Sequence, residues 1–400
     1  MENVYICDYI RTPIGRYGGS LSSVRADDLG AAPLRALAAR NPHMNLDQID
    51  EVVFGCANQA GEDNRNVARM SLLLAGFPET VPGTTVNRLC GSGMDAVLIA
   101  ARMIKAGEAD LVVAGGTESM SRAPFVLPKA TKAFARSNEI HDTTIGWRLI
   151  NPEMDRKYGT DSMPQTAENV ATDYKVSRSD QDKFALRSQQ RTQLSTEQGK
   201  FAKEVIPVAI QQRRGPAIVV EVDEHPRAGS SLESLTSLRP IVATNGTITA
   251  GNSSGVNDGA AALILASERA VIDNNLTPIA KFLGGATSGV APRVMGIGPI
   301  SATTKLMQRL QLTQKDFSLI ELNEAFAAQS LATLRGLGIS DDDGRVNPNG
   351  GAIALGHPLG MSGARITGTA AVNISAGQRS LSTMCVGVGQ GIAIVLEGVR

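Results

Sequence analysis

The sequence has few of the residues that cross-link small proteins, and neither sign of charge is in excess. Its 400 residues include only four cysteines, which lie far apart without a CxxC pair. Neither a disulfide scaffold nor a zinc ribbon is therefore expected. Lysine and arginine number 39, and aspartate and glutamate also number 39. Without a net positive field, and with only 4% aromatic residues for base stacking, a nucleic-acid partner is not expected.

Long apolar runs and obvious address signals are also missing. No stretch approaches the roughly 18 apolar residues of a membrane-spanning helix. The sequence starts Met-Glu-Asn-Val-Tyr, without a basic region followed by an apolar one. With reduced thiols as the default for scattered cysteines, we expect a cytoplasmic protein that needs no membrane and no metal.

Glycine is present in number, and its distribution is informative. The 41 glycines cluster beside short apolar runs, a pattern typical of buried strands that end in tight turns. Such strands are predicted at residues 51–55, 110–116 and 318–322, with helical patterns between them. Alternating strands and helices predict an α/β fold with largely buried sheets.

Three elements occur twice in the same order, which predicts a duplicated domain. They are a strand leading to a helix (49–59 and 317–326), a Val-Asn segment that runs through glycines into a helix (86–93 and 346–363), and a strand, glycine turn and strand (247–267 and 380–398). We assign residues 1–123 and 243–273 to the first half and 274–400 to the second. The charged insertion 124–242 is expected to bind a ligand, although a subdomain that only stabilises an oligomer would look the same.

Several residues in glycine-rich surroundings are candidates for chemistry. Cys90 precedes an amphipathic segment, and a thiol at a helix N-terminus is expected to favour the thiolate, unless it is an inert core cysteine. His357 lies in a glycine-dense turn that suits a base or an oxyanion donor. Cys385 ends a predicted strand, where the amide of Gly387 could point into a pocket. Asn323 lies at another strand end, where caps and turns use the same residue type.

The segment Gly251-Asn-Ser-Ser-Gly255 matches the nucleophile elbow of serine hydrolases. That motif requires a strand before it and a helix directly after it. Residues 259–266 are instead predicted to form a strand. A serine hydrolase is therefore a remote alternative.

Four blocks together resemble the signature blocks of the thiolases. They are Asn-Arg-Leu-Cys-Gly-Ser-Gly (87–93), Asn-Glu-Ala-Phe (323–326), Gly-His-Pro (356–358) and Cys-Val-Gly-Val-Gly-Gln-Gly (385–391). The resemblance covers essentially the whole chain. It implies the thiolase fold: two similar βαβαβαββ halves in a five-layered αβαβα arrangement, with a loop domain inserted in the first half.

The resemblance also implies roles for single residues. Cys90 would carry the acyl group, His357 would activate it, and Cys385 would exchange a proton with the acetyl α-carbon. A water held by Asn323 would help His357 to stabilise the enolate, and the amides of Cys90 and Gly387 would hold the tetrahedral oxyanion. Acyl-CoA and CoA would be the substrates, without a prosthetic group, in a homodimer or homotetramer. The implied cofactor contacts are Arg227, Ser234, Ser254, Met163 and Phe326.

Within the family, segments 11–19, 55–69 and 139–148 are similar to the 3-oxoadipyl-CoA thiolases of bacterial aromatic catabolism. Those enzymes convert 3-oxoadipyl-CoA and CoA into succinyl-CoA and acetyl-CoA. Ser162 also stands where acetoacetyl-CoA thiolases carry a histidine. A distal carboxylate needs a cation or several donors, and the hypothesis is that Arg148, His141 or Arg65 contributes. A generic acetyl-CoA acetyltransferase or 3-ketoacyl-CoA thiolase, and a non-catalytic acyl-CoA binder, are the alternatives.

Overall fold

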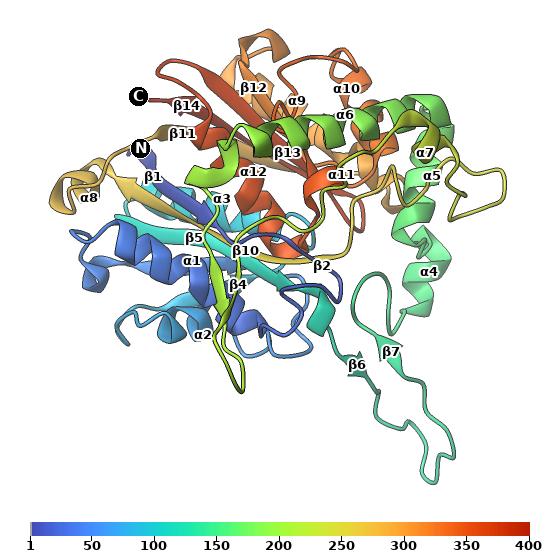
Figure 1. The fold of residues 1–400 in the computed structure, drawn as a ribbon, viewed down its shortest axis with the longest axis horizontal. Helices are drawn as coiled ribbons and strands as arrows, with labels where there is room; N and C mark the ends of the chain where they lie inside the picture. Colours follow the sequence, from blue (N-terminus) through green and yellow to red (C-terminus); the bar gives the residue numbers. More distant parts are fainter. Residues whose placement is uncertain (1) are drawn as a thin grey trace.

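The computed structural model describes residues 2–400 and shows two similar α/β halves whose strands join into one sheet (Figure 1). The strand order is β4-β3-β5-β10-β1 through the first half and β11-β14-β13-β12 through the second. The halves meet where β1 pairs antiparallel with β11, with Tyr5 opposite Lys281 and Ile6 opposite Ala280. The strands are β1 (Val4–Arg11), β3 (Glu51–Gly55), β4 (Gly83–Val86), β5 (Leu111–Ser119), β10 (Asn257–Ser267), β11 (Ala280–Gly289), β12 (Leu319–Leu322), β13 (Arg379–Val386) and β14 (Gln390–Gly398), with the short β2 (Gly15–Arg16) beside β10.

The helices form three layers, and the strands of each half lie between the central layer and one outer layer. This confirms the predicted αβαβα arrangement. The helices α3 (Ser92–Ala106) and α12 (Leu359–Val372) pack on each other and touch strands of both halves. On the outer faces, α1 (Ala26–Arg40) and α2 (Val67–Leu74) cover the first half. The helix α9 (Gly298–Leu310) covers the second half, with α10 (Ala327–Gly336) beside it.

Glycines allow the two central helices to approach closely. A Cβ on Gly93 of α3 would lie 2.5 Å from the carbonyl oxygen of Gly360, and a Cβ on Gly363 of α12 would lie 2.4 Å from the amide nitrogen of Met94. Because real Cβ atoms do not come this near to backbone, both positions require glycine. At Gly93 and Gly363, the glycines therefore reflect contact between the two halves.

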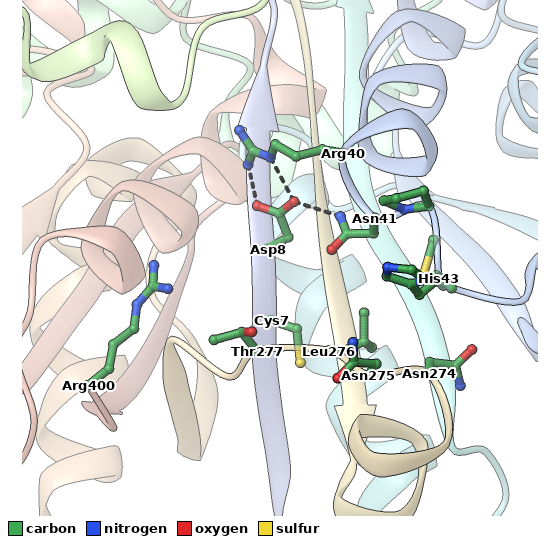
Figure 2. A pocket seen from close by; sticks show the side chains of 12 residues that line it. Cys7, Asp8, Arg40, Asn41, His43, Asn274, Asn275, Leu276, Thr277 and Arg400 are labelled. Carbon is green, nitrogen blue, oxygen red and sulfur yellow. Dashed lines mark hydrogen bonds and ion pairs between the residues drawn. The ribbon is translucent and has the colours of Figure 1, made fainter.

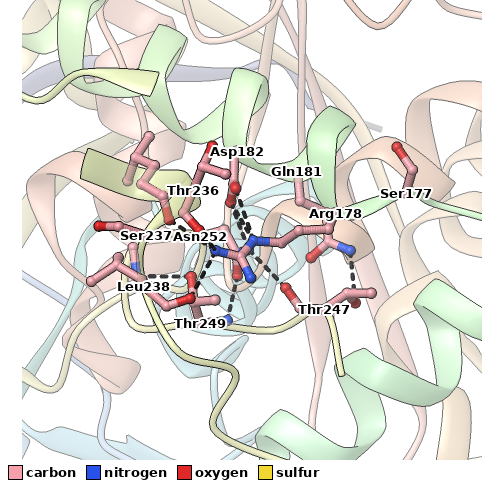
Figure 3. A network of polar contacts seen from close by, with 12 residues as sticks. Ser177, Arg178, Gln181, Asp182, Thr236, Ser237, Leu238, Thr247, Thr249 and Asn252 are labelled. Atoms are coloured by element: carbon pink, nitrogen blue, oxygen red, sulfur yellow. Dashed lines mark hydrogen bonds and ion pairs between the residues drawn. The ribbon is translucent and has the colours of Figure 1, made fainter. Parts of the chain in front are cut away.

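The third repeated element was predicted incorrectly. Residues 247–256 form a loop, and only β10 is a strand, so the hairpin β13–β14 corresponds to the separated strands β5 and β10. Hydrogen bonds to Asp182 and Ala325, rather than pairing with a neighbouring strand, hold this loop. The Asn252 amide donates to Asp182 of α6 (Arg178–Glu197; 3.1 Å), as part of the network in Figure 3, and the backbone N–H of Ser254 donates to the carbonyl of Ala325 (2.9 Å).

The insertion lies between the end of β5 and the start of β10, and the predicted limits 124–242 stay a prediction. It contains a predicted long polar helix, α6 (Arg178–Glu197), whose N-cap Ser177 accepts a hydrogen bond from the Asp180 amide (3.1 Å). A long loop joining β6 to β7 projects from the body (Figure 1). The other elements are β6 (Phe125–Val126), β7 (His141–Asp142), α4 (Pro152–Tyr158), α5 (Met163–Asp173), β8 (Val208–Ile210), β9 (Ile218–Val220) and α7 (Leu232–Thr236).

Two further short helices complete the fold: α8 (Glu268–Asp273) follows β10, and α11 (Ala352–Leu355) precedes α12. Throughout residues 2–400, no helix combines the length and the hydropathy needed to cross a bilayer.

Candidate active site

Cys90 lies in a constrained turn between β4 and α3. The preceding Leu89 has a φ of 46°, in the left-handed region that non-glycine residues rarely adopt. The Ser92 hydroxyl stabilises the turn, because it accepts from the Arg88 amide (2.9 Å) and donates to the Leu89 carbonyl (2.6 Å). Backbone strain held in this way is common at reactive positions. The turn leaves the Cys90 side chain half-buried at the wall of a cavity.

The expectation that Cys90 rests as a thiolate is wrong. Burial raises the pKa of the Cys90 thiol to about 11, and the charge of nearby Glu118 adds to this. The backbone amides of Gly387 and of Cys90 itself donate toward the sulfur and lower the pKa, but by less. Desolvation thus outweighs the helix terminus, and Cys90 needs a base before it can attack.

His357 supplies a basic nitrogen that is fixed by its surroundings. It lies just before α12, buried, and its backbone N–H donates to Asn257 Oδ1 (2.9 Å). Its Nδ1 lies 2.6 Å from Ser362 Oγ, and that hydroxyl donates to the Pro358 carbonyl (2.8 Å). Since the hydroxyl has a single proton, Nδ1 carries a hydrogen and donates to Ser362, which leaves Nε2 with its lone pair.

The same Nε2 faces Asn323 and belongs to a neutral ring. Burial, and then the charge of Arg365, lower the pKa of His357 to about 3. Asn323 Nδ2 lies 3.4 Å from Nε2, whereas Asn323 Oδ1 is buried without a hydrogen-bond partner among residues 2–400. An orphaned buried acceptor at this place fits the predicted water, because such groups are normally satisfied.

Cys385, near the end of β13, and Gly387, in the turn after that strand, complete the centre. The Cys385 side chain is fully buried, and burial together with the neighbouring Cys90 raises the pKa of its thiol well above the ordinary value. Both thiols line the same cavity. A thiol kept protonated in this way suits proton donation.

A cavity of about 470 Å³ brings most of the predicted residues together. All three chemical groups, Cys90, His357 and Cys385, line it. The predicted cofactor contacts Met163, Phe326, Ser254 and Arg227 line it as well.

The structure does not bring the other predicted contacts to the cavity. Ser234 is exposed, and its hydroxyl forms a capping box with Ser231 at the start of α7. Arg65 is exposed, His141 pairs with Glu139 (3.8 Å), and Arg148 donates to the nearby Gly146 carbonyl (3.4 Å). None of the three cations lines the cavity. The hypothesis that one of them reaches a distal carboxylate therefore has no support in this geometry, because sequence spacing does not show which side chains the fold brings to the cavity.

Sequence reasoning missed His225, which also lines the cavity. Its Nδ1 lies 3.3 Å from Asn257 Nδ2, the same asparagine that holds the His357 backbone. Burial, with the charge of Arg227, lowers the pKa of His225 to about 4, so that the ring is neutral. A signal existed, since His225 is one of only four histidines and stands two residues before Arg227.

The competing sites lack suitable chemistry. Ser253 is followed by a loop and β10 rather than by a helix, and its hydroxyl donates to the Thr249 carbonyl (2.7 Å). The predicted strand after the motif is thus confirmed, and the segment is not a nucleophile elbow. A separate cleft of about 310 Å³ near the C-terminus contains Cys7 (Figure 2). Burial raises the pKa of that thiol to about 12, and Arg40 in the cleft is bound by Asp8.

Comparison with known protein families decides the identity of the fold and site. The chain matches the family description "Thiolase, N-terminal domain" over residues 4–269 and "Thiolase, C-terminal domain" over residues 276–398. The chain belongs to the thiolase family. As a thiolase it is an acyltransferase, and coenzyme A is its co-substrate.

Similar thiolases are known from bacteria and from human mitochondria. The chain is 63% identical over 400 residues to the "Beta-ketoadipyl-CoA thiolase" of Pseudomonas aeruginosa. It is 60% identical over 401 residues to the "3-oxoadipyl-CoA/3-oxo-5,6-dehydrosuberyl-CoA thiolase" of Escherichia coli. Both matches cover 100% of each chain. The solved human mitochondrial 3-ketoacyl-CoA thiolase in complex with CoA is 38% identical, with a TM-score of 0.91 over 100% of this thiolase and 98% of that chain.

Proposed function

We propose that this thiolase cleaves 3-oxoadipyl-CoA with CoA into succinyl-CoA and acetyl-CoA. The observation that carries the chemistry is the convergence of Cys90, His357 and Cys385 on one cavity. The identity of 60–63% to full-length relatives named for this substrate, against 38% to a 3-ketoacyl-CoA thiolase, supports the choice of acyl group.

The first half-reaction breaks the bond between C2 and C3 of the substrate. His357 Nε2 takes the Cys90 proton, and the thiolate attacks the 3-keto carbon, so that the carbonyl electrons move to an oxyanion held by the amides of Cys90 and Gly387. When the oxyanion collapses, the electron pair of the C2–C3 bond passes to C2 as the enolate of acetyl-CoA. The imidazolium N–H and a water on Asn323 stabilise the enolate oxygen, and the Cys385 thiol protonates C2.

The second half-reaction returns the enzyme to its starting state. Acetyl-CoA leaves, and the Cys385 thiolate removes the thiol proton of an incoming CoA. The CoA thiolate attacks the acyl-Cys90 thioester, the same two amides hold the second tetrahedral oxyanion, and Cys90 leaves and recovers its proton from His357. The products are succinyl-CoA and free enzyme, and both protons are accounted for.

The cofactor would enter along the part of the cavity formed by the insertion and the 247–256 loop. Arg227 and Ser254 line this part. Phe326 belongs to the same apolar cluster as Cys385, and Met163 packs against that cluster. The exposed Arg227 guanidinium suits an anionic cofactor, and Ser234 is retained only as a contact outside the cavity. Assembly as a homodimer or homotetramer and a cytoplasmic location belong to the same proposal.

A generic acetyl-CoA acetyltransferase or 3-ketoacyl-CoA thiolase would use the same catalytic groups, so substrate preference separates the functions. Thiolysis rates with 3-oxoadipyl-CoA, acetoacetyl-CoA and an uncharged six-carbon 3-ketoacyl-CoA should show the highest kcat/KM for the first. Cys90→Ser should lower kcat with each of them by on the order of a thousandfold or more. Equal kcat/KM for all three would refute the proposed preference for 3-oxoadipyl-CoA. Arg148→Ala, tested with the same three substrates, should change kcat/KM by the same factor for each, because Arg148 does not line the cavity.

A further inference from the structure

Glu118 is a buried carboxylate beneath the active site that the mechanism above does not use. It lies near the end of β5, only 1% exposed. One oxygen, Oε2, accepts from the backbone amides of Ala57 (2.9 Å) and Gly360 (2.7 Å), and Oε1 accepts from the amide of Asn58 (2.9 Å). Among residues 2–400, no cationic side chain forms an ion pair with it. Burial raises the pKa of Glu118 to about 7, and the three amide bonds offset this only in part.

A metal site is the first alternative for this carboxylate. Ligand atoms of Cys56, Asp63 and Glu118 lie within 4.8 Å of one another. However, both Glu118 oxygens already accept amide protons, and the Cys56 thiol lies 2.9 Å from the Asn58 carbonyl as a hydrogen-bond donor. Since these polar atoms are satisfied without an ion, the cluster does not require one.

The three amides belong to segments that carry the reacting groups. Gly360 is in the first turn of α12, three residues after His357, so the carboxylate also caps this helix from the other half of the molecule. Ala57 accepts from the Asn87 side chain in the Cys90 turn (3.1 Å). Asn58 donates through its side chain to Thr143 (3.1 Å), which precedes the cavity-lining Ile145.

We propose that Glu118 is a positioning residue that fixes the His357 segment of the second half against the Cys90 turn of the first. Glu118 does not line the cavity, and the inference rests on the thiolase chemistry proposed for Cys90. Displacement of a reacting group by about 1 Å can reduce a rate about a hundredfold. A carboxylate that joins both segments is placed to prevent such a displacement.

Glu118→Gln tests this proposal because it keeps the shape and removes the charge and one acceptor. The amide nitrogen of glutamine would face a backbone N–H, so at least one of the three bonds is lost. We expect kcat to fall by on the order of tenfold to a hundredfold, with KM for CoA changed less than about twofold.

Alkylation of Cys90 by iodoacetamide provides the readout that simple loosening would not produce. Cys90 shares its cavity with His357 and with Cys385 from β13, the Gly387 amide donates to its sulfur, and the charge of Glu118 from β5 acts on it. Ligand atoms of Asp63 and Cys56 lie within 4.8 Å of Glu118. Because the Glu118 charge raises the pKa of Cys90, its removal should move the alkylation midpoint to lower pH. Faster alkylation together with slower turnover supports the proposal.

Any other combination of alkylation rate and turnover in Glu118→Gln overturns the proposal that Glu118 is a positioning residue. An unchanged kcat, or a fall in both turnover and alkylation, contradicts positioning by Glu118. Asp63→Asn is the matched control, since Asp63 is buried in the same cluster without a bond to Gly360, and an equal loss of kcat there would also overturn the proposal. If Glu118→Gln does not fold, Glu118→Asp decides: it should keep the alkylation midpoint and lose kcat, and a wild-type kcat is the contrary result. Absence of thiolysis in the wild type would instead count against the proposed function, while the alkylation shift remains measurable.

Discussion

Two arginines pair with aspartates on the same helix, α6, and differ mainly in burial, which provides a matched test of the Figure 3 network. Arg178 Nε lies 3.0 and 2.8 Å from the two Asp182 oxygens, and its Nη2 donates to the carbonyls of Leu235 (2.8 Å), Thr236 (3.3 Å) and Leu238 (3.0 Å). The Asp182 side chain is 1% exposed. Arg335 pairs with Asp180 and Asp341, and all three side chains are 36–38% exposed.

The expected cost of losing each arginine differs severalfold. Arg178→Met leaves Asp182 buried with Asn252 as its remaining partner, and breaking a buried pair on one side costs about 3–5 kcal/mol. Arg335→Met breaks exposed pairs worth about 1 kcal/mol or less. With an unfolding entropy of about 0.8 kcal/mol/K for 400 residues, the apparent Tm should fall by about 4–6 °C for Arg178→Met and about 1 °C or less for Arg335→Met.

Circular-dichroism melts of wild type and both variants at one scan rate measure these shifts, because a chain of this size can unfold irreversibly. Asn252 also holds the loop that carries Ser254 into the cavity. Arg178→Met should therefore raise KM for CoA, whereas Arg335→Met should leave it unchanged. Equal Tm shifts for the two variants, or a wild-type melt for Arg178→Met, would refute the reasoning.

Three further outcomes follow from the same geometry. Cys90→Ser should lower kcat by on the order of a thousandfold or more and abolish the acyl-enzyme mass that wild type shows after brief mixing with substrate. Gly116→Ala would place a Cβ 2.0 Å from the Gly360 carbonyl oxygen and should cost at least about 1–3 kcal/mol by overpacking, while Gly344→Ala, which meets open space, should leave the melt nearly unchanged. The buried neutral His357 has its pKa lowered to about 3, below its ordinary value of about 6.5. Between these pH values the unfolded chain binds more protons than the folded chain. The contribution of neutral His357 to the free energy of unfolding is therefore complete above about pH 6.5 and is lost as the pH falls. Urea titrations from pH 7 to 4 should show that the free energy of unfolding of His357→Asn falls less steeply with pH than that of wild type.

The elements that could be predicted are those whose sequence pattern depends on local structure. The strands at 51–55 and 318–322 are short segments rich in Val, Leu, Ile and Phe, and the α6 N-cap is a serine before a polar helix. Cys90, His357 and Cys385 could also be found, because each lies in a glycine-rich block where backbone approaches backbone. In these cases the local sequence and the tertiary structure impose the same requirement.

The features that could not be predicted depend on contacts between distant segments. The segment 247–256 resembles a strand and turn, yet Asp182 and Ala325 hold it as a loop. The Cys90 pKa depends on how deeply the turn is buried between two halves, which the position before a helix does not reveal. Glu118 ends an apolar strand, and only the fold shows that its carboxylate meets an amide 242 residues away.

The duplication itself accounts for the composition of the active site. Cys90 precedes α3 and His357 precedes α12, and these two helices are equivalent elements that pack on each other at the centre of the fold. Cys385 and Glu118 lie near the ends of the equivalent strands β13 and β5, and both interact with the Cys90 thiol. Each half therefore contributes one helix start and one strand end, and sequence divergence has made one pair nucleophile and base. Because neither half alone contains both, any substitution that separates α3 from α12 should reduce catalysis before it unfolds the chain.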